Sequence, residues 1–148
     1  MDKTEEYIEM CRNADDIQAL WIKKIGDYYF NPDYYSNNKV SIIFDGYIRC
    51  KEEGKKWYGG TYNHNEQVID GAVWLPRQDQ LQEMIDWEKN GLYGVVMIDA
   101  FYDFSKTNYD SEPFNNTEMS WERLWLSFVM HELYKKRWTG TKWVSEFT

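Results

Sequence analysis

Apolar residues recur every three or four positions near the start of the chain, which is the spacing of one face of an α-helix. Thr4 belongs to the residue types that cap helix N-termini, and Gly26 to the types that end helices. The pattern therefore predicts one amphipathic helix over residues 4–24. Its apolar stripe consists of Tyr7, Cys11, Ala14, Ile17, Trp21 and Ile25.

Short β-rich runs separated by turn residues follow this helix. Connections this short join antiparallel neighbours, because a parallel pair needs a crossover of about a dozen residues or more. A later run is apolar on both of its alternating faces, as in a central strand that is covered on each side. The sequence thus predicts a mainly antiparallel sheet with strands at residues 28–30, 39–50, 56–62, 67–75 and 93–104.

Two further helices are predicted, with a short strand after the second. Pro76 loses no hydrogen bond in a first helical turn, so a helix is expected over residues 77–90. Thr117 or Ser120 can cap a final helix that runs to about residue 136, and residues 141–144 can add the strand. Apolar residues cover more than half of the circumference of the final helix, which is more than one packing face needs.

Length and composition indicate one folded domain, residues 1–148. A chain of 148 residues has the usual size of a single domain, and 18% of its residues are aromatic, which provides enough apolar area for a sizeable core. The expected fold class is α+β, with helices covering a mainly antiparallel sheet.

Charge and cysteine usage narrow the range of partners. The net charge is −8, and residues 67–118 hold 3 basic against 10 acidic residues, a local charge of −7. This negative charge argues against binding to duplex nucleic acid, because affinity for a duplex depends on Lys and Arg side chains that neutralise its phosphates. The basic run at residues 135–137 is interpreted as a favourable charge near a helix C-terminus. Two distant cysteines without zinc spacing indicate a reduced, intracellular setting, and no apolar run is long enough to predict a membrane partner.

No catalytic residue, cofactor or metal site is predicted. His131 and Glu132 begin a zinc-helix pattern, but the second histidine is replaced by Lys135, which is protonated at neutral pH. Asp99 and Asp103 share one face of the predicted strand, where they would stand about 13 Å apart, too far to share an ion.

Seven residues form the candidate interaction surface. Tyr28, Tyr29, Tyr34 and Tyr35 surround a predicted turn, where aromatic faces can contact a protein or stack on bases. The alternative is that alternate tyrosines pack on the sheet. The remaining members come from the apolar excess of the final helix, and they are Trp121, Leu126 and Met130.

Two segments, residues 74–84 (WLPRQDQLQEM) and 121–138, resemble the corresponding stretches of a family of small bacteriophage proteins, the phage α/β/α ("ABA") sandwich proteins. Residues 7–11, 17–18 and 26–27 are similar to the same family. The resemblance implies a three-layered α/β/α sandwich and a phage protein that acts in the host cytoplasm. It implies no catalytic residues.

Three functional hypotheses follow from these observations. The first is a non-enzymatic interaction module that binds a host or phage protein, or itself as a homo-oligomer. The second is a nucleic-acid-directed accessory protein, either an acidic DNA mimic that uses residues 67–118 or a single-strand binder that uses the tyrosines. A small enzyme ranks third, because no nucleophile and base, and no metal set, can be assembled from the sequence.

Overall fold

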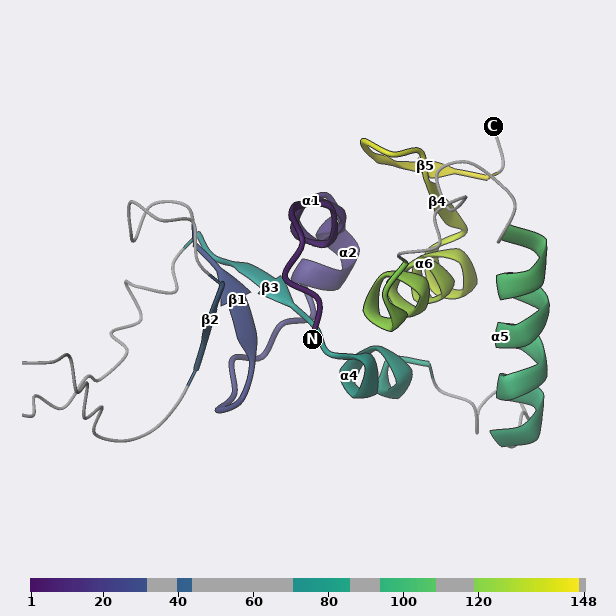
Figure 1. The fold of residues 1–148 in the computed structure, drawn as a ribbon, viewed down its shortest axis with the longest axis horizontal. Helices are drawn as coiled ribbons and strands as arrows, with labels where there is room; N and C mark the ends of the chain where they lie inside the picture. Colours follow the sequence, from purple (N-terminus) through teal and green to yellow (C-terminus); the bar gives the residue numbers. More distant parts are fainter. Residues whose placement is uncertain (32–39, 44–70, 86–93, 109–118, 147–148) are drawn as a thin grey trace, which may run out of the picture.

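The computed structural model describes residues 1–31, 40–43, 71–85, 94–108 and 119–146, and its helices and strands confirm the α+β class (Figure 1). The predicted strand at residues 56–62, most of the one at 39–50 and the first part of the one at 67–75 lie outside the described residues. The helices are α1 (Glu5–Arg12), α2 (Asp15–Gln18), α4 (Gln78–Glu83), α5 (Gly94–Asn108) and α6 (Trp121–Tyr134). The strands are β1 (Tyr28–Phe30), β2 (Val40–Ile42), β3 (Val73–Leu75), β4 (Lys136–Trp138) and β5 (Trp143–Ser145).

The single helix predicted over residues 4–24 is instead two helices, α1 and α2. Thr4 caps α1 as expected, since its side chain accepts from the Tyr7 N–H. The Asn13 side-chain amide then donates to the Glu9 carbonyl at 2.8 Å, and the backbone leaves the helical region at Ala14. Two acidic residues follow at once and favour a new helix N-terminus. Gly26 does not end a helix; it adopts φ +93° in the turn before β1.

The larger sheet is antiparallel and has the order β2-β1-β3. Tyr29 stands opposite Ser41 on one side and Trp74 on the other. At Trp74 the side-chain amide of Gln18 acts like a neighbouring strand. It accepts from the Trp74 N–H at 2.8 Å and donates to the Trp74 carbonyl at 3.0 Å. These bonds satisfy backbone groups that an edge strand would otherwise leave open.

Residues 94–108 form helix α5, so the central strand predicted over residues 93–104 is wrong. The side chains that pack against the core are Met97, Ala100, Phe101 and Phe104. Their spacing of i, i+3, i+4 and i+7 is that of one helical face. Both faces of the segment are apolar, which made a two-residue alternation look equally good. The separation of about 13 Å inferred for Asp99 and Asp103 assumed a strand and is therefore also wrong. On a helix the two residues are neighbours at i and i+4.

Helix α6 begins at the expected cap and ends sharply. The Ser120 hydroxyl accepts from the Arg123 N–H at 3.2 Å and donates to the Asp2 carboxylate, so Ser120, not Thr117, is the cap. Lys135 closes the helix in the left-handed region with φ 51°. Lys136 and Arg137 already belong to β4, which pairs with β5 in an antiparallel hairpin. The interpretation of residues 135–137 as charges in the last turn is therefore corrected.

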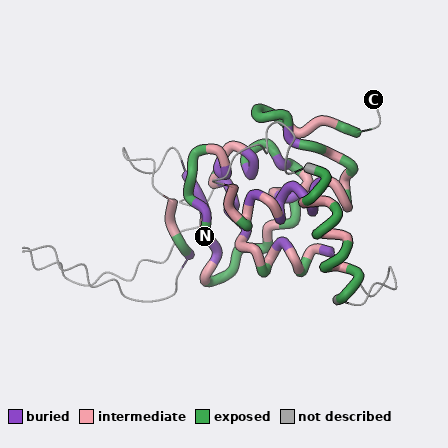
Figure 2. Tube along the Cα trace, turned by 45° about the vertical axis from the view of Figure 1, so that its right-hand side comes forward, coloured by how far each residue is buried: buried purple, intermediate pink, exposed green. Residues whose placement is uncertain are grey.

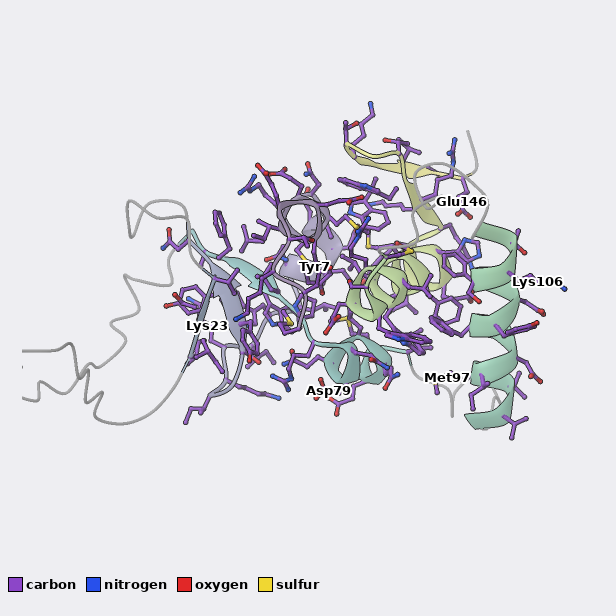
Figure 3. All side chains as sticks on the ribbon, in the orientation of Figure 1. Tyr7, Lys23, Asp79, Met97, Lys106 and Glu146 are labelled. Carbon is purple, nitrogen blue, oxygen red and sulfur yellow. The ribbon has the colours of Figure 1, made fainter. Side chains whose placement is uncertain are left out.

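The described elements follow one another across the molecule from β2 to α5. Figure 1 shows the sheet, then α1, α2 and α4, then α6, and finally α5 at the far edge. α6 contacts α1, α4, α5 and β4, and the buried positions concentrate around it (Figure 2). Tyr7 reaches into this core from α1, whereas Lys106 points outward from α5 (Figure 3). Within the described ranges, no helix combines the length and apolar character needed to cross a membrane.

Candidate functional site

The structure places the seven predicted interaction residues in different environments. Trp121 is 59% exposed and Tyr28 is half-buried. Tyr29 is buried against Ile43 and Trp21, as the alternative interpretation of the tyrosines expects. Tyr34 and Tyr35 lie outside the described residues. The tyrosines are therefore not shown to form one surface.

Leu126 and Met130 have no exposed side-chain surface, so assigning them to an interaction surface is corrected. The reason is the position of α6, which is surrounded by α1, α4, α5 and β4. The apolar excess that the sequence shows on α6 is covered by all four elements together. α5 covers the side of α6 that carries Trp125, whose ring stacks on Phe101 with centroids 4.1 Å apart. Assigning α5 as a strand hid the element that covers this side of α6.

Among the described helices, α5 carries the most exposed large apolar side chains. Val95, Ile98 and Tyr102 follow one another at i, i+3 and i+7, with exposed fractions of 70%, 63% and 60%. Trp121 is not part of this surface, because its ring stacks at 6.0 Å on Phe101, which belongs to the core-facing side of α5. We call the three residues Val95, Ile98 and Tyr102 the α5 patch.

Acidic side chains border the α5 patch. Asp99 and Asp103 are exposed on the same outward side of the helix, and neither forms an ion pair with a described residue. Lys106 is the one basic residue of α5, and it also points outward (Figure 3). The border of the patch therefore has a negative balance.

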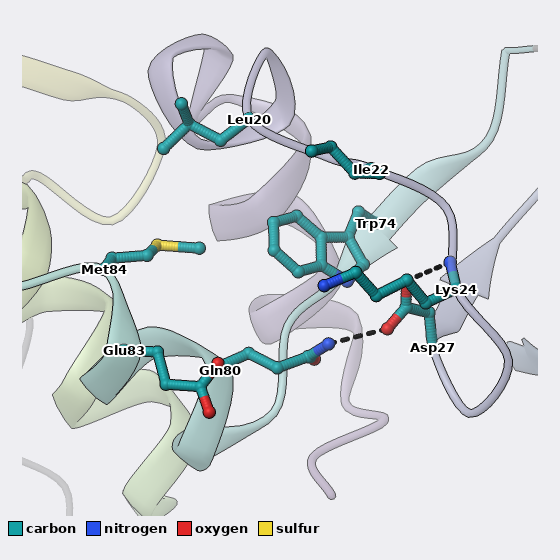
Figure 4. Close-up of a pocket in the computed structure, with 8 residues that line it drawn as sticks. All are labelled: Leu20, Ile22, Lys24, Asp27, Trp74, Gln80, Glu83 and Met84. Atoms are coloured by element: carbon teal, nitrogen blue, oxygen red, sulfur yellow. Dashed lines mark hydrogen bonds between the residues drawn. The ribbon is translucent and has the colours of Figure 1, made fainter.

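A second candidate is a cavity of about 180 Å³ between the loop after α2, β3 and α4 (Figure 4). The carboxylate of Asp27, only 2% exposed, organises this loop. It accepts from the Trp21 indole N–H at 3.0 Å, from the Lys24 backbone N–H at 2.9 Å and from the Gln80 amide at 2.6 Å. Asp27 and Gln80 are thus already paired, and they hold the walls of the cavity in place.

The remaining cavity walls combine apolar surface with two free charges. Leu20, Ile22, Trp74 and Met84 form the apolar part. Met84 points toward Trp74, and the Lys24 side chain extends from the facing loop in front of Trp74 in this view (Figure 4). Lys24 and Glu83 have no ion-pair partner among the described residues. The buried indole N–H of Trp74 has no acceptor either.

Two further side chains with catalytic or metal-ligating potential, His131 and Cys11, lie outside both candidate sites. His131 Nδ1 lies 2.8 Å from the Glu146 carboxylate, and its Nε2 lies 3.6 Å from Glu132. Burial raises the pKa of the Cys11 thiol and holds it in the neutral form, which is unreactive as a nucleophile. In the described ranges, no three His, Cys, Asp or Glu side chains gather in a way that could hold a metal ion.

Sequence reasoning missed both the outward face of α5 and the cavity. A signal for the first was present: residues 95, 98 and 102 repeat at helical spacing beside the core-facing set. The cavity combines three segments that are distant in the sequence, and no local pattern links Ile22 to Met84. An available hint was the group of apolar residues at 20, 22 and 25, which exceeds what one helical face needs.

Comparison with protein-family models, curated proteins and solved structures finds no match for this chain.

Proposed function

We propose that this protein is a non-enzymatic interaction module that binds another protein through the α5 patch. The observation that carries the proposal is that α5 is apolar on two opposite sides. One side packs on α6, and the other presents Val95, Ile98 and Tyr102 to solvent. An exposed apolar stripe bordered by charged residues is typical of a protein interaction site, so a second partner is the natural occupant of the exposed side.

The charge around the patch favours a basic partner over a second copy of the chain. Asp99 and Asp103 border the patch, and residues 67–118 carry a net −7 in sequence. Two copies docked face to face would bring these acidic borders together, which opposes association. We therefore propose a partner segment with an apolar helical stripe flanked by Lys or Arg.

The resemblance to the phage ABA sandwich family provides the setting of this proposal. In that setting the protein comes from a bacteriophage, and its partner is a host or phage protein in the host cytoplasm. The three-layered α/β/α arrangement implied by the family belongs to the same proposal. An experimental structure of the whole chain would test that arrangement.

The test uses two designed helical peptides with the same leucine stripe, one flanked by lysines and one by glutamates. Fluorescence polarisation should show saturable binding of the lysine peptide that weakens with added salt, and much weaker binding of the glutamate peptide. Ile98→Gln and Tyr102→Gln should each weaken binding by about ten-fold, which corresponds to about 1.4 kcal/mol.

Ile25→Gln is the matched control, because Ile25 is 68% exposed and Ile98 is 63% exposed. This variant should bind the lysine peptide like the unmodified protein. Equal weakening by all three variants, or equal binding of both peptides, would contradict the proposal. A dimer in light scattering that Ile98→Gln dissociates would make a second copy the occupant instead.

A further inference from the structure

The cavity next to Trp74 has the size and lining of a site for one ring. Its volume is about 180 Å³, and a cavity of about 150 Å³ lined by aliphatic and aromatic groups is enough to hold a benzene molecule. Leu20 and Ile22 are 50% and 75% exposed, so an occupant can enter from solvent and bury them. Covering such side chains favours binding through the hydrophobic effect.

Lys24 is the cation of the cavity wall, and none of the described residues neutralises it. The Lys24 ammonium has no anionic partner among the described residues, although its backbone is held by Asp27 at 2.9 Å. Trp74 is only 6% exposed, and its indole N–H is closed off from solvent, with no acceptor among the described residues. Lys24 is therefore the charged donor that an anion entering the cavity can reach.

The other polar groups of the cavity limit the charge of the occupant. Asp27 accepts from the loop and from the Gln80 amide, whose oxygen in turn accepts from the Arg77 N–H, so neither group supplies a positive charge to an occupant. Glu83 also lines the cavity, and its carboxylate, which forms no ion pair with a described residue, disfavours a second negative charge. One anionic group, placed on the Lys24 side of the opening, is therefore the best match.

We propose that this cavity binds a small aromatic monocarboxylate. Its ring packs between Leu20, Ile22, Trp74 and Met84, and its carboxylate pairs with Lys24. The site is separate from the α5 patch and from the partner proposed there. It makes the protein responsive to a small molecule as well as to a protein.

The test titrates ¹⁵N-labelled protein with phenylacetate and with its neutral analogue phenylacetamide. Phenylacetate should shift the Trp74 indole cross-peak saturably with a dissociation constant of about 1–10 mM, as expected for a ligand of this size. Trp74→Phe identifies that cross-peak by its loss. Lys24→Met should weaken the binding of phenylacetate by about five-fold and leave the binding of phenylacetamide unchanged, since the substitution removes a solvent-exposed charge and keeps an apolar side chain.

Lys23→Met is the matched control. Lys23 is the adjacent residue, its ammonium lies 5.8 Å from the Trp21 ring centre, and it does not line the cavity. Phenylacetate should bind this variant as it binds the unmodified protein.

Absence of a saturable shift up to about 50 mM would overturn the proposal. Equal effects of the two lysine variants, or equal binding of acid and amide, would overturn the assignment of an anionic ligand. The α5 patch variants should not alter any of these results.

Discussion

Tyr7 joins α1 to the segment between β3 and α4 through one buried hydrogen bond. Its hydroxyl donates to the Pro76 carbonyl at 2.5 Å, and its side chain is fully buried. Burial raises the pKa of Tyr7 well above its usual value of 10, with nearby Cys11 as the next cause. The phenol therefore stays neutral in the folded protein at pH values where it ionises in the unfolded chain.

Tyr7→Phe should lower the free energy of unfolding by about 1–2 kcal/mol at pH 7, because the Pro76 carbonyl loses its donor. The raised pKa means that the stabilising effect of Tyr7 is fully present below pH 10. It declines as the pH rises above 10, where only the unfolded tyrosine ionises. Urea unfolding at pH 7 and pH 11 should show the two proteins converging.

Tyr102→Phe, at an exposed position on α5, controls for tyrosine replacement itself. A gap between the unmodified protein and Tyr7→Phe that stayed constant up to pH 11 would show that folding leaves the ionisation of Tyr7 unchanged.

Asp27 and Asp79 are two carboxylates near Arg77 that should differ strongly in their effect on stability. Asp27 is buried and accepts three hydrogen bonds, so Asp27→Ala should lower the free energy of unfolding by about 3 kcal/mol. Asp79 is 61% exposed and pairs with Arg77 at 3.0 Å, so Asp79→Ala should cost less than about 1 kcal/mol. Thermal or urea unfolding at pH 7 measures the loss of stability in each of the two alanine variants.

Hydrogen bonding to Arg77 lowers the pKa of Asp79. The small contribution of Asp79 is therefore present above its unfolded pKa near 4 and is lost as the pH falls below that value. Similar losses for the two alanine variants at pH 7 would mean that Asp27 does not organise the loop as described.

At the scale of whole elements, α6 offers a comparison between two tryptophans one turn apart. Trp125 is 4% exposed and stacks on Phe101, whereas Trp121 is 59% exposed at the start of the helix. Trp125→Ala should lower the free energy of unfolding by about 3–5 kcal/mol, because its removal leaves a cavity. Trp121→Ala should cost about 1 kcal/mol or less. Urea midpoints that fall equally would place both rings in the core.

Local signals in the sequence predicted some elements well. Ser120 at the start of α6, the β-rich run at β1 and the strand after Gly140 depend on short-range chemistry, namely capping and turn formation. The start of α1 at Thr4 has the same origin. Such features require no knowledge of distant parts of the chain.

Elements decided by distant contacts were harder to predict. α5 carries apolar residues on every side, so its periodicity fitted a strand as well as a helix, and only its packing on α6 separates the two. The break between α1 and α2 places Gln18 against Trp74, 56 positions later in the chain. The candidate site has the same difficulty: Trp121 could be predicted as exposed, whereas the burial of Leu126 and Met130 depends on which elements pack around α6.

At the scale of the whole molecule, the basic groups are few and several are already paired. Lys136, in the basic run at residues 135–137, lies 2.5 Å from the Asp16 carboxylate. The buried Arg123 guanidinium lies 2.5 Å from Glu6. These pairs link α6 and β4 to the N-terminal helices, and they reduce the positive surface available for phosphates. The net charge of −8 acts in the same direction.

Duplex DNA should therefore show no saturable binding up to about 100 µM protein, even at 20 mM salt, where an electrostatic interaction would be strongest. Fluorescence anisotropy of labelled 20-base-pair and single-stranded oligonucleotides measures this, with light scattering on the same samples to follow self-association. Affinity for the duplex that falls steeply with salt and that Lys135→Gln and Arg137→Gln weaken would contradict the expectation. It would identify the basic run as a phosphate site. Binding of the single strand alone would instead favour the tyrosine-rich segment, because base stacking on aromatic rings does not require a positively charged face.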